Sequence, residues 1–471
     1  MIADLKPYAE YKDSGLPWLG QVPGHWNLLR AKCLFREIDE RSKTGKEELL
    51  SVSHLTGVTP RRHKTITMFL AKSNVGHKVC RPGDTVINTM WAWMGALGVT
   101  QHTGIVSPAY GVYRPIEGCG VTPRYADHLL RTPIYSAEYQ RRSTGVNSSR
   151  MRLYPEQFLR VPIIVPTIDE QAAIVRFLDW ANGRLERTIR AKRKVIALLI
   201  EQKQAIIHRA VTRGLDPNVP LKASGVAWLG DTPRHWQIQR LRQVATMKPS
   251  KSESIELLRA NTEVTFLPME RVASNGVIDS SVKAKSSDVW NGFTYFKCGD
   301  VIVAKITPCF ENGKGAFLDS LPTTIGFGST EFHVIRPRSQ ILGAYLRLIT
   351  SSKQFLDNGE NSMTGSAGQK RVPTDFVKNY PFALPTKHEQ HLILTFVSTR
   401  TSGIDAVISR LHREIELLRE YRTRLVADVV TGKLDVRKAA AQLPTIDAES
   451  PIEPDRADVE EASDELVEDE A

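Results

Sequence analysis

Two short stretches of the chain are nearly the same. Residues 12–26 read KDSGLPWLGQVPGHW, and residues 222–236 read KASGVAWLGDTPRHW. Nine of the fifteen positions are identical, including both tryptophans of each stretch. Because tryptophan is rare, agreement at these positions is far beyond chance, and self-similarity at a fixed offset is the mark of a repeated architecture. The chain is a tandem duplication.

The similarity returns at three further places. The triplet Pro-Gly-Asp at 82–84 matches Cys-Gly-Asp at 298–300, and each is followed by a β-branched run that predicts a strand. The end of each copy matches as well, IDEQ at 168–171 with KHEQ at 387–390, and VTRGLD at 211–216 with VTGKLD at 430–435. Each copy is thus a variable body between matching ends.

A long helix is expected after Glu170 and again after Glu389. Apolar residues recur there at spacings of four and seven, which is typical of packed helices. They are Leu185, Ile189, Ile196, Leu199 and Ile206 in the first copy, and Ile404, Ile408, Leu411, Ile415, Leu418, Leu425 and Val429 in the second. Each helix should end near Gly214 or Gly432. Lys203 and Arg422 lie in these apolar seams, either to fix register or as snorkelling side chains.

Length and composition allow two or three compact domains, because 471 residues with 41% hydrophobic and 24% charged content are ordinary for a globular protein. No apolar run approaches the roughly 20 residues that cross a bilayer, so we expect a cytoplasmic protein with no membrane partner. The five cysteines stand singly, without the spacing of a zinc site or a disulfide framework. They predict buried free thiols.

The net charge of +11 is unevenly distributed. Residues 447–471 hold twelve Asp or Glu and one Arg, so residues 1–446 carry +22. Such a surplus suits a protein that neutralises DNA phosphates, although it could equally serve an acidic protein partner or solubility. The acidic, proline-containing end has too few large apolar groups to fold alone. We expect it to be a disordered tail.

These motifs together resemble type I restriction-modification specificity subunits. The resemblance spans about residues 10–437 and rests on SGLPWLGQVPGHW opening a copy, WAWMGALG within it, the Pro-x-x-x-Glu-Gln helix start, and the duplication itself. It implies a mixed α/β fold with two tandem target-recognition domains, each followed by a long helix. The two helices would pack as an antiparallel coiled coil with pseudo-two-fold symmetry. The expected ranges are 1–166 and 215–385 for the domains, 167–214 and 386–438 for the helices, and 439–471 for the tail.

The resemblance also implies what the chain does and with what. Each domain would read one half of a bipartite double-stranded DNA target, and unlike loops would make that target asymmetric. Two modification subunits would bring S-adenosylmethionine and methylate adenine, while two restriction subunits would bring ATP-driven translocation and cleavage with magnesium. The chain itself is expected to hold no cofactor and no metal, and to catalyse nothing.

Loops that combine cations, amides and aromatic residues are the candidate DNA contacts, because phosphates attract Lys and Arg whereas base edges need directional donors and acceptors. The alternative is a solvated surface charge for any one cation, and packing within the domain for either tryptophan. The first-domain candidates are Arg61, Arg62, Lys64, Asn88, Trp91, Trp93, Arg141, Arg142, Asn147, Arg150 and Arg152. Those of the second domain are Lys305, Asn312, Lys314, Ser366, Gln369, Lys370 and Arg371.

Other functions fit less well. The sequence has no (Asn/Asp)-Pro-Pro-(Tyr/Phe) pocket of a methyltransferase and no Gly-x-x-x-x-Gly-Lys-Ser/Thr loop of a motor. His25 and His235 precede a tryptophan in each copy and are expected to cap or pack. A stand-alone DNA-binding regulator is the main alternative, since it would use the same basic loops. A nuclease with an unrecognised site would have to cleave DNA as an isolated chain.

Overall fold

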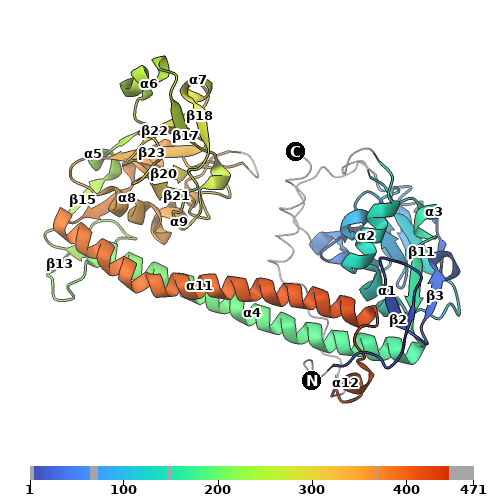
Figure 1. Cartoon of the computed structure of the whole chain (residues 1–471). Helices are drawn as coiled ribbons and strands as arrows, with labels where there is room; N and C mark the ends of the chain where they lie inside the picture. Colours follow the sequence, from blue (N-terminus) through green and yellow to red (C-terminus); the bar gives the residue numbers. More distant parts are fainter. Residues whose placement is uncertain (1–4, 64–72, 146–150, 366–368, 445–471) are drawn as a thin grey trace. The chain divides into compact units, whose positions relative to one another are not determined.

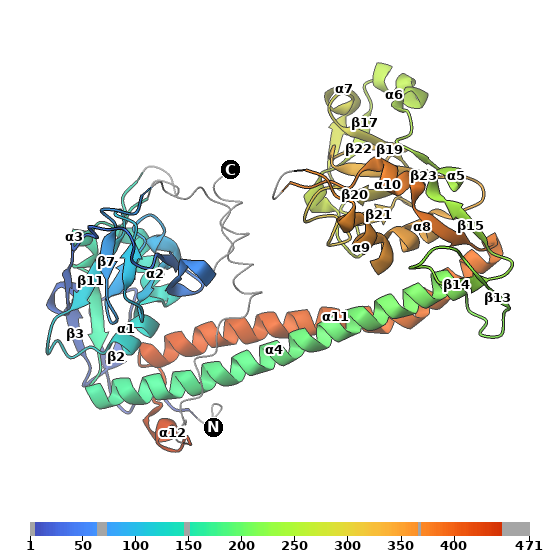
Figure 2. The same ribbon diagram turned by 180° about the vertical axis from the view of Figure 1, so that it is seen from behind.

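The computed structural model describes residues 5–63, 73–145, 151–365 and 369–444 (Figures 1 and 2). Contacts within the chain define two compact units. Unit 1 consists of residues 1–192 and 413–471, and unit 2 of residues 193–412. The expected ranges placed each recognition domain and each helix in separate segments. By contacts, each unit instead combines one domain with part of both long helices.

Unit 1 is built on a four-stranded antiparallel sheet in the order β4-β11-β8-β9. Helices α1, Pro123–Leu130, and α2, Pro133–Arg142, follow this sheet along the chain, and the short helix α3, Pro155–Phe158, comes after them. The sheet strands are β4 Phe35–Glu37, β8 Thr85–Ile87, β9 Leu97–Val99 and β11 Gly111–Pro115. Four two-stranded pairs surround it, β1 Tyr11–Asp13 with β2 Gln21–Pro23, β3 Asn27–Arg30 with β12 Pro162–Val165, β5 Leu50–Ser53 with β6 Gly57–Pro60, and β7 Lys78–Cys80 with β10 Gly104–Val106.

Unit 2 repeats the four-stranded sheet in the order β16-β23-β20-β21 and adds a second sheet in the order β18-β17-β22-β19. The strands are β16 Ala245–Met247, β20 Val301–Ala304, β21 Gly315–Phe317 and β23 Phe332–Pro337 in the first sheet, and β17 Glu263–Leu267, β18 Lys283–Lys285, β19 Thr294–Lys297 and β22 Ile325–Gly328 in the second. Two pairs complete it, β13 Leu221–Ala223 with β14 Asp231–Pro233 and β15 Gln237–Arg240 with β24 Pro381–Leu384. Its shorter helices are α5 Leu241–Val244, α6 Ile255–Arg259, α7 Ser286–Val289, α8 Gly343–Thr350, α9 Lys353–Asn361 and α10 Thr374–Asn379. The mixed α/β fold class expected from the sequence is confirmed.

The repeated Gly-Asp motif has the same task in both sheets. Asp84 is buried and accepts two hydrogen bonds from the Arg114 guanidinium. Nε and Nη2 of Arg114 each lie 2.8 Å from a carboxylate oxygen. Asp300 is equally buried and holds Arg336 at 2.6 and 2.8 Å. A paired charge with two parallel hydrogen bonds is the favourable way to bury a carboxylate. The motif therefore ties the strand after it to the neighbouring strand.

Two long helices follow the two domains. Helix α4 is Ile168–Arg213 and α11 is Lys387–Val430, and they lie side by side in Figures 1 and 2. In unit 1, Arg422 contacts Glu186 at 3.3 Å and Lys192 contacts Glu414 at 2.5 Å, so residue numbers rise along one helix as they fall along the other. The helices are antiparallel there. In unit 2, Lys203 pairs with Asp405 at 2.6 Å. Both seam cations thus bind an acid on the other helix.

The repeated Pro-x-His-Trp stretch closes each unit over the end of a helix. In unit 1, Trp26 is fully buried and lies against Gly432, which follows α11 with a φ of +80°. In unit 2, Trp236 lies against Gly214, which follows α4 with a φ of +74°. Each copy therefore packs on the helix that belongs to the other copy. The core of unit 1 accordingly includes Val429 and Val430, and that of unit 2 includes Ile207 and Ala210.

The Glu-Gln pair at the start of each helix explains the two histidines. The Glu170 carboxylate accepts hydrogen bonds from His25 at 2.9 Å and from Trp26 Nε1 at 3.4 Å. Glu389 does the same for His235 and Trp236 at 2.8 and 3.0 Å. The adjoining glutamines bind backbone, Gln171 accepting from Thr122 N and Gln390 from Leu342 N. The interpretation of His25 and His235 as packing residues is confirmed.

Two expectations need correction. The second helix was expected to run to 438 and the tail to begin at 439. Instead α11 stops at Val430, near Gly432 as the glycine pattern predicted, because Gly432 adopts a left-handed conformation, and α12, Arg437–Ala441, follows. Ala439, Ala440 and Leu443 are buried, so residues 439–444 belong to unit 1. Residues 445–471 lie outside the described part of the chain. The cysteines are free as expected, but of the five only Cys80 is buried, and Cys33 and Cys298 are exposed.

Candidate nucleic-acid interface

The loop after β8 is the centre of the candidate site in unit 1. Asn88 is buried, and its Nδ2 donates to Tyr110 Oη at 3.1 Å while its Oδ1 accepts from Met90 N at 3.2 Å. Trp91 and Trp93 are half-buried and stack on each other with ring centroids 6.0 Å apart. Trp93 Nε1 donates to Met90 O at 3.0 Å. These contacts fit the packing alternative for the tryptophans and give the loop a fixed shape.

The two ends of the segment 143–152, which reads STGVNSSRMR, lie beside this first loop. Thr144 and Arg152 exchange two backbone hydrogen bonds of 3.0 Å, and Leu153 N donates to Thr89 O at 2.9 Å. The exposed Arg152 side chain reaches Met90, with Nη2 4.0 Å from Sδ. The fold therefore brings Arg152 to the same edge as Asn88. Asn147 and Arg150, between these ends, lie outside the described residues.

Arg141 and Arg142 are already engaged by a buried acid. Both donate to Glu138, Arg141 Nε at 2.8 Å and Arg142 Nε at 2.6 Å. Burial opposes ionisation of this carboxyl, but the two guanidinium groups hold the pKa of Glu138 below its ordinary value. The Arg142 side chain is 17% exposed and that of Arg141 is 65% exposed. Of the two, Arg141 offers the more accessible cation.

The basic segment after β6 contributes one residue near the same loop. Burial raises the pKa of the Tyr110 phenol, and the positive charge of the nearby Arg61 offsets part of this rise. Since Tyr110 binds Asn88, Arg61 belongs to the same neighbourhood. Arg62 is exposed and pairs with Glu48 at 2.8 Å. Lys64 lies outside the described residues.

The matching edge of unit 2 is formed by the loop after β20. Lys305 N donates to Glu331 O, and Val372 N donates to Lys305 O at 2.8 Å. Thr307 N donates to Lys370 O at 3.0 Å, so residues 369–372 lie along this loop just as 152–153 lie along the loop of unit 1. Asn312 is exposed and Lys314 is half-buried. Equivalent positions of the two units therefore carry unlike side chains.

Glu331 holds two of the predicted cations. Arg371 places Nε 3.0 Å and Nη2 3.1 Å from its carboxylate oxygens, and Lys305 Nζ lies 3.9 Å away. Gln369 and Lys370 are exposed. Ser366 lies outside the described residues. The sequence missed both acidic partners. Glu138 could have been found from its spacing of three and four to Arg141 and Arg142 on a helix, whereas Glu331 is 40 residues from Arg371.

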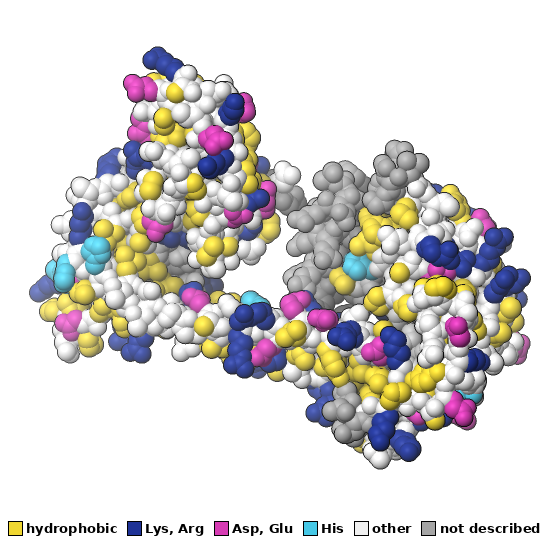
Figure 3. Space-filling model, in the orientation of Figure 1, with side chains coloured by type: hydrophobic (Ala, Val, Ile, Leu, Met, Phe, Trp, Pro, Cys, Tyr) yellow, Lys and Arg dark blue, Asp and Glu magenta, His cyan; other side chains and the backbone are white. Residues whose placement is uncertain are grey.

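Charge on the long helices is mixed. Figure 3 shows basic, acidic and apolar side chains interleaved along the visible face of α4 and α11.

Within the ranges that the structure describes, there is no group of three or more His, Cys, Asp or Glu placed to hold a metal ion. Within the same ranges, no helix has the length and apolar character needed to cross a bilayer.

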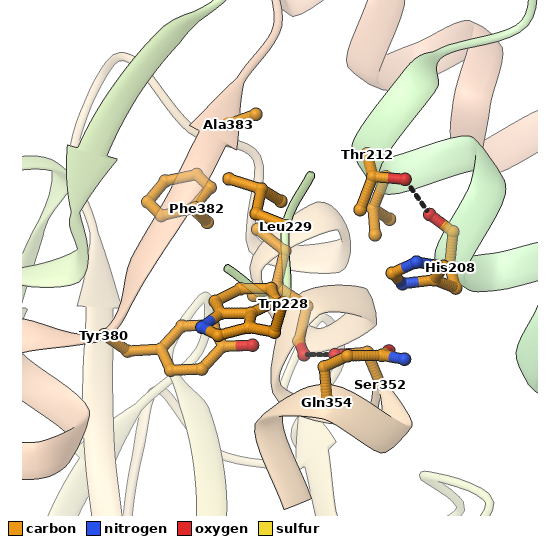
Figure 4. Close-up of a pocket in the computed structure, with 11 residues that line it drawn as sticks. His208, Thr212, Trp228, Leu229, Ser352, Gln354, Tyr380, Phe382 and Ala383 are labelled. Carbon is orange, nitrogen blue, oxygen red and sulfur yellow. Dashed lines mark hydrogen bonds between the residues drawn. The ribbon is translucent and has the colours of Figure 1, made fainter. Parts of the chain in front are cut away.

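A small pocket in unit 2 has another character. It lies beside the end of α4 and is lined by Trp228, Leu229, Phe382 and other mostly apolar residues (Figure 4). Trp228 stacks on Tyr380 with ring centroids 4.9 Å apart. His208 Nδ1 and Gln354 Oε1 are buried there without a hydrogen-bond partner in the structure. The pocket lies where the second repeat stretch, residues 222–236, packs on the end of α4. None of the predicted DNA contacts lines it.

Comparison with known families identifies the second domain. The family model described as the type I restriction modification DNA specificity domain matches residues 233–417. This segment is therefore similar to type I specificity domains. The matched residues include β20, β23, the loop 305–314 and the start of α11, so the candidate loops of unit 2 lie within the match. The resemblance seen in the sequence is confirmed.

Curated relatives agree. The chain is 41% identical over 167 residues to the type I restriction enzyme EcoAI specificity subunit of Escherichia coli, covering 35% of this chain and 28% of that protein. It is 22% identical over 317 residues to the StySPI specificity subunit of Salmonella potsdam, covering 67% and 66%. The chain thus spans less than a third of the length of the EcoAI subunit in that match.

A solved structure shares the fold. A chain of a type I R-M system, studied for complex assembly and conformational transition, superposes with a TM-score of 0.58 at 15% identity, covering 88% of this chain and 99% of that chain. At this identity the likeness concerns the fold. It extends the comparison from residues 233–417 to 88% of the chain.

Proposed function

We propose that this chain is the DNA-reading specificity subunit of a type I restriction-modification complex. One observation carries the proposal: each unit presents a loop and a pair of bridged residues, Thr144 with Arg152 or Thr364 with Arg371, at the equivalent edge of its four-stranded sheet, but with different side chains. Unit 1 offers Arg61 and Arg152 beside the loop that contains the buried Asn88, whereas unit 2 offers Lys305, Asn312 and Lys370. A duplicated reader with unlike edges suits two unlike half-sites, and therefore an asymmetric bipartite target.

The long helices are the surface for the partner subunits in this proposal. Several large apolar side chains on them are exposed, among them Leu198 at 55% in unit 2 and Leu417 at 63% in unit 1. In this proposal, the partner subunits cover these exposed apolar side chains. Two modification subunits would bring S-adenosylmethionine, and two restriction subunits would bring ATP and magnesium. In this proposal, the chain recognises the DNA sequence and contributes no catalytic group.

The test is to purify the chain with its modification subunits and map methylated adenine across genome-sized DNA. A split, asymmetric methylated motif that requires this chain is the expected result. The control is each component alone. Stable sequence-specific binding by the chain without any partner association would favour a stand-alone regulator, and metal-dependent cleavage by the isolated chain would favour a nuclease. Either result would overturn the proposal.

A further inference from the structure

An exposed turn after β17 in unit 2 lies next to the candidate DNA loop. Val272 and Ile278 form a bridge, and Ala273 N donates to Val277 O at 2.9 Å, so residues 273–277 project as a tight tip. Asn275 Oδ1 accepts from Val277 N at 3.1 Å, which fixes the amide at the tip. Val277 is 62% exposed. The Val277 side chain is therefore too exposed to contribute to the core of this unit.

Arg347 of α8 holds this tip against the loop after β20. Its Nη2 donates to Ser274 O at 3.2 Å and to Gly313 O at 2.9 Å. Because one nitrogen reaches both carbonyls, the tip and the loop are fixed as neighbours. Close packing supports this, since a Cβ added at Gly276 would lie 3.8 Å from Gly315 O. The tip therefore extends the edge formed by Lys305 and Asn312.

The environment of Arg347 is unusual for a cation. The residue is 9% exposed, and its Nη1 has no hydrogen-bond partner in the structure. Burial lowers the pKa of Arg347 to about 10, with no nearby carboxylate offsetting it, so the group stays charged at neutral pH. A buried charge without an acid is costly. Its Nη2 binds backbone carbonyls of the turn 273–277 and of the loop after β20, which suits a residue that positions the two segments.

Unit 1 contains a similar arrangement. Arg131, which follows α1, donates through Nη2 to His54 O at 3.1 Å and to Leu55 O at 2.7 Å. These carbonyls lie in the turn after β5, and Leu55 in that turn is 45% exposed. Helices α1 and α8 are counterparts, because Gln171 and Gln390 hold their starts. Each domain thus uses an arginine from the same helix region to hold an exposed turn that carries an aliphatic side chain.

We propose that the turn 273–277 is a further DNA-contacting element of unit 2, with Asn275 and Val277 at base edges and Arg347 as its positioning residue. The inference rests on the proposed function. An asparagine amide suits the hydrogen-bonding edge of a base, and an aliphatic side chain suits the methyl group of thymine. The backbone of the turn that carries them lies beside the loop that carries Asn312. The partner is duplex DNA, in the half-site that the second domain reads.

The test is a methylation map with the full complex carrying Asn275→Ala and Val277→Ala together. Both residues are exposed, so the variant should fold. We expect discrimination at one or two base positions of one half-site to fall about 10-fold, with the other half-site unchanged. Ser339→Ala is the matched control. Strands β20 and β23 are antiparallel, with Ala304 opposite Phe332, so Ser339 after β23 lies at the far end of the sheet.

Arg347→Met tests the positioning role, with Arg347→Lys as the conservative variant. We expect the Met variant to relax the same base positions as the tip variant, and the Lys variant to recover part of the preference. A merely structural role would lower methylation at all sites without changing the preferred bases, which would overturn the positioning role. Unchanged base preference in the exposed tip variant would overturn the inference itself. Absence of a split motif with the unsubstituted chain would instead refute the proposed function.

Discussion

Replacing Gly432 with alanine should destabilise unit 1 specifically. A Cβ at this position would lie 2.4 Å from Pro23 Cδ and 3.0 Å from Trp26 Cη2. The proline ring is rigid and Trp26 is fully buried, so neither can move aside without disturbing the core. The left-handed φ of +80° costs about 1 kcal/mol for alanine, and overpacking adds about 1 to 3 kcal/mol. The expected loss is therefore about 2 to 4 kcal/mol.

Hydrogen exchange measured by mass spectrometry can locate this loss. Since about 1.4 kcal/mol corresponds to a factor of ten, amides of β3 and β12 should exchange about 30-fold to several hundred-fold faster. Peptides of β15 and β24 in unit 2 serve as the internal reference.

Two alanine variants calibrate the measurement. Gly15 has a φ of +70° with no heavy atom within 4 Å of an added Cβ, so Gly15→Ala reports the backbone cost alone, about 1 kcal/mol. Gly214→Ala meets Trp236 Cζ2 at 3.2 Å and should weaken unit 2 instead. If Gly432→Ala and Gly15→Ala accelerate exchange equally, the close approach to Pro23 does not lower the free energy of unfolding, and the reasoning is wrong.

Three further predictions concern charge, reading and spacing. Burial opposes ionisation of Glu389, but hydrogen bonds from Trp236 and His235 lower its pKa to about 2. The stabilisation by Glu389 is thus complete above the ordinary pKa of 4.5 and disappears as pH falls through 2. In urea unfolding, Glu389→Gln should therefore show a weaker dependence on pH in this range than the unsubstituted chain. Alanine at Gln369, Lys370 and Arg371 should weaken reading of one half-site in a methylation map, and equal loss at both would refute the assignment. A heptad inserted beside Leu199 should change the spacer between methylated half-sites, whereas an unchanged spacer would mean that the partners position the domains.

The repeat made much of the fold predictable. The Gly-Asp motif indicated the strands β8 and β20, and the apolar spacing indicated α4 and α11, because both patterns depend on residues close in sequence. Leu185, Ile189 and Ile196 are indeed buried along α4. The closure of unit 1 by Gly432 was not predictable, since its partners are Pro23 and Trp26, about 400 residues away. No local pattern records such a contact.

The candidate site was less accessible to sequence reasoning. Loops rich in Arg and Lys were easy to find, but their acidic partners were not. Glu331 pairs with Arg371 across 40 residues. Arg347 reads as an ordinary helical cation, and its burial between two backbone carbonyls follows only from the packing of α8. Side-chain pairing across the sheet, rather than composition, decides which cations are accessible.

The way each domain packs on the other copy's helix sets an order of assembly during translation. Unit 2 is one continuous stretch, residues 193–412, so all of its core exists once α11 has begun to leave the ribosome. The first domain precedes the second along the chain, yet the core of unit 1 also includes Val429, Val436 and Ala440. This core therefore cannot be complete until α12 has been synthesised. The end of α11 and α12 together close the first domain after the second domain has been made.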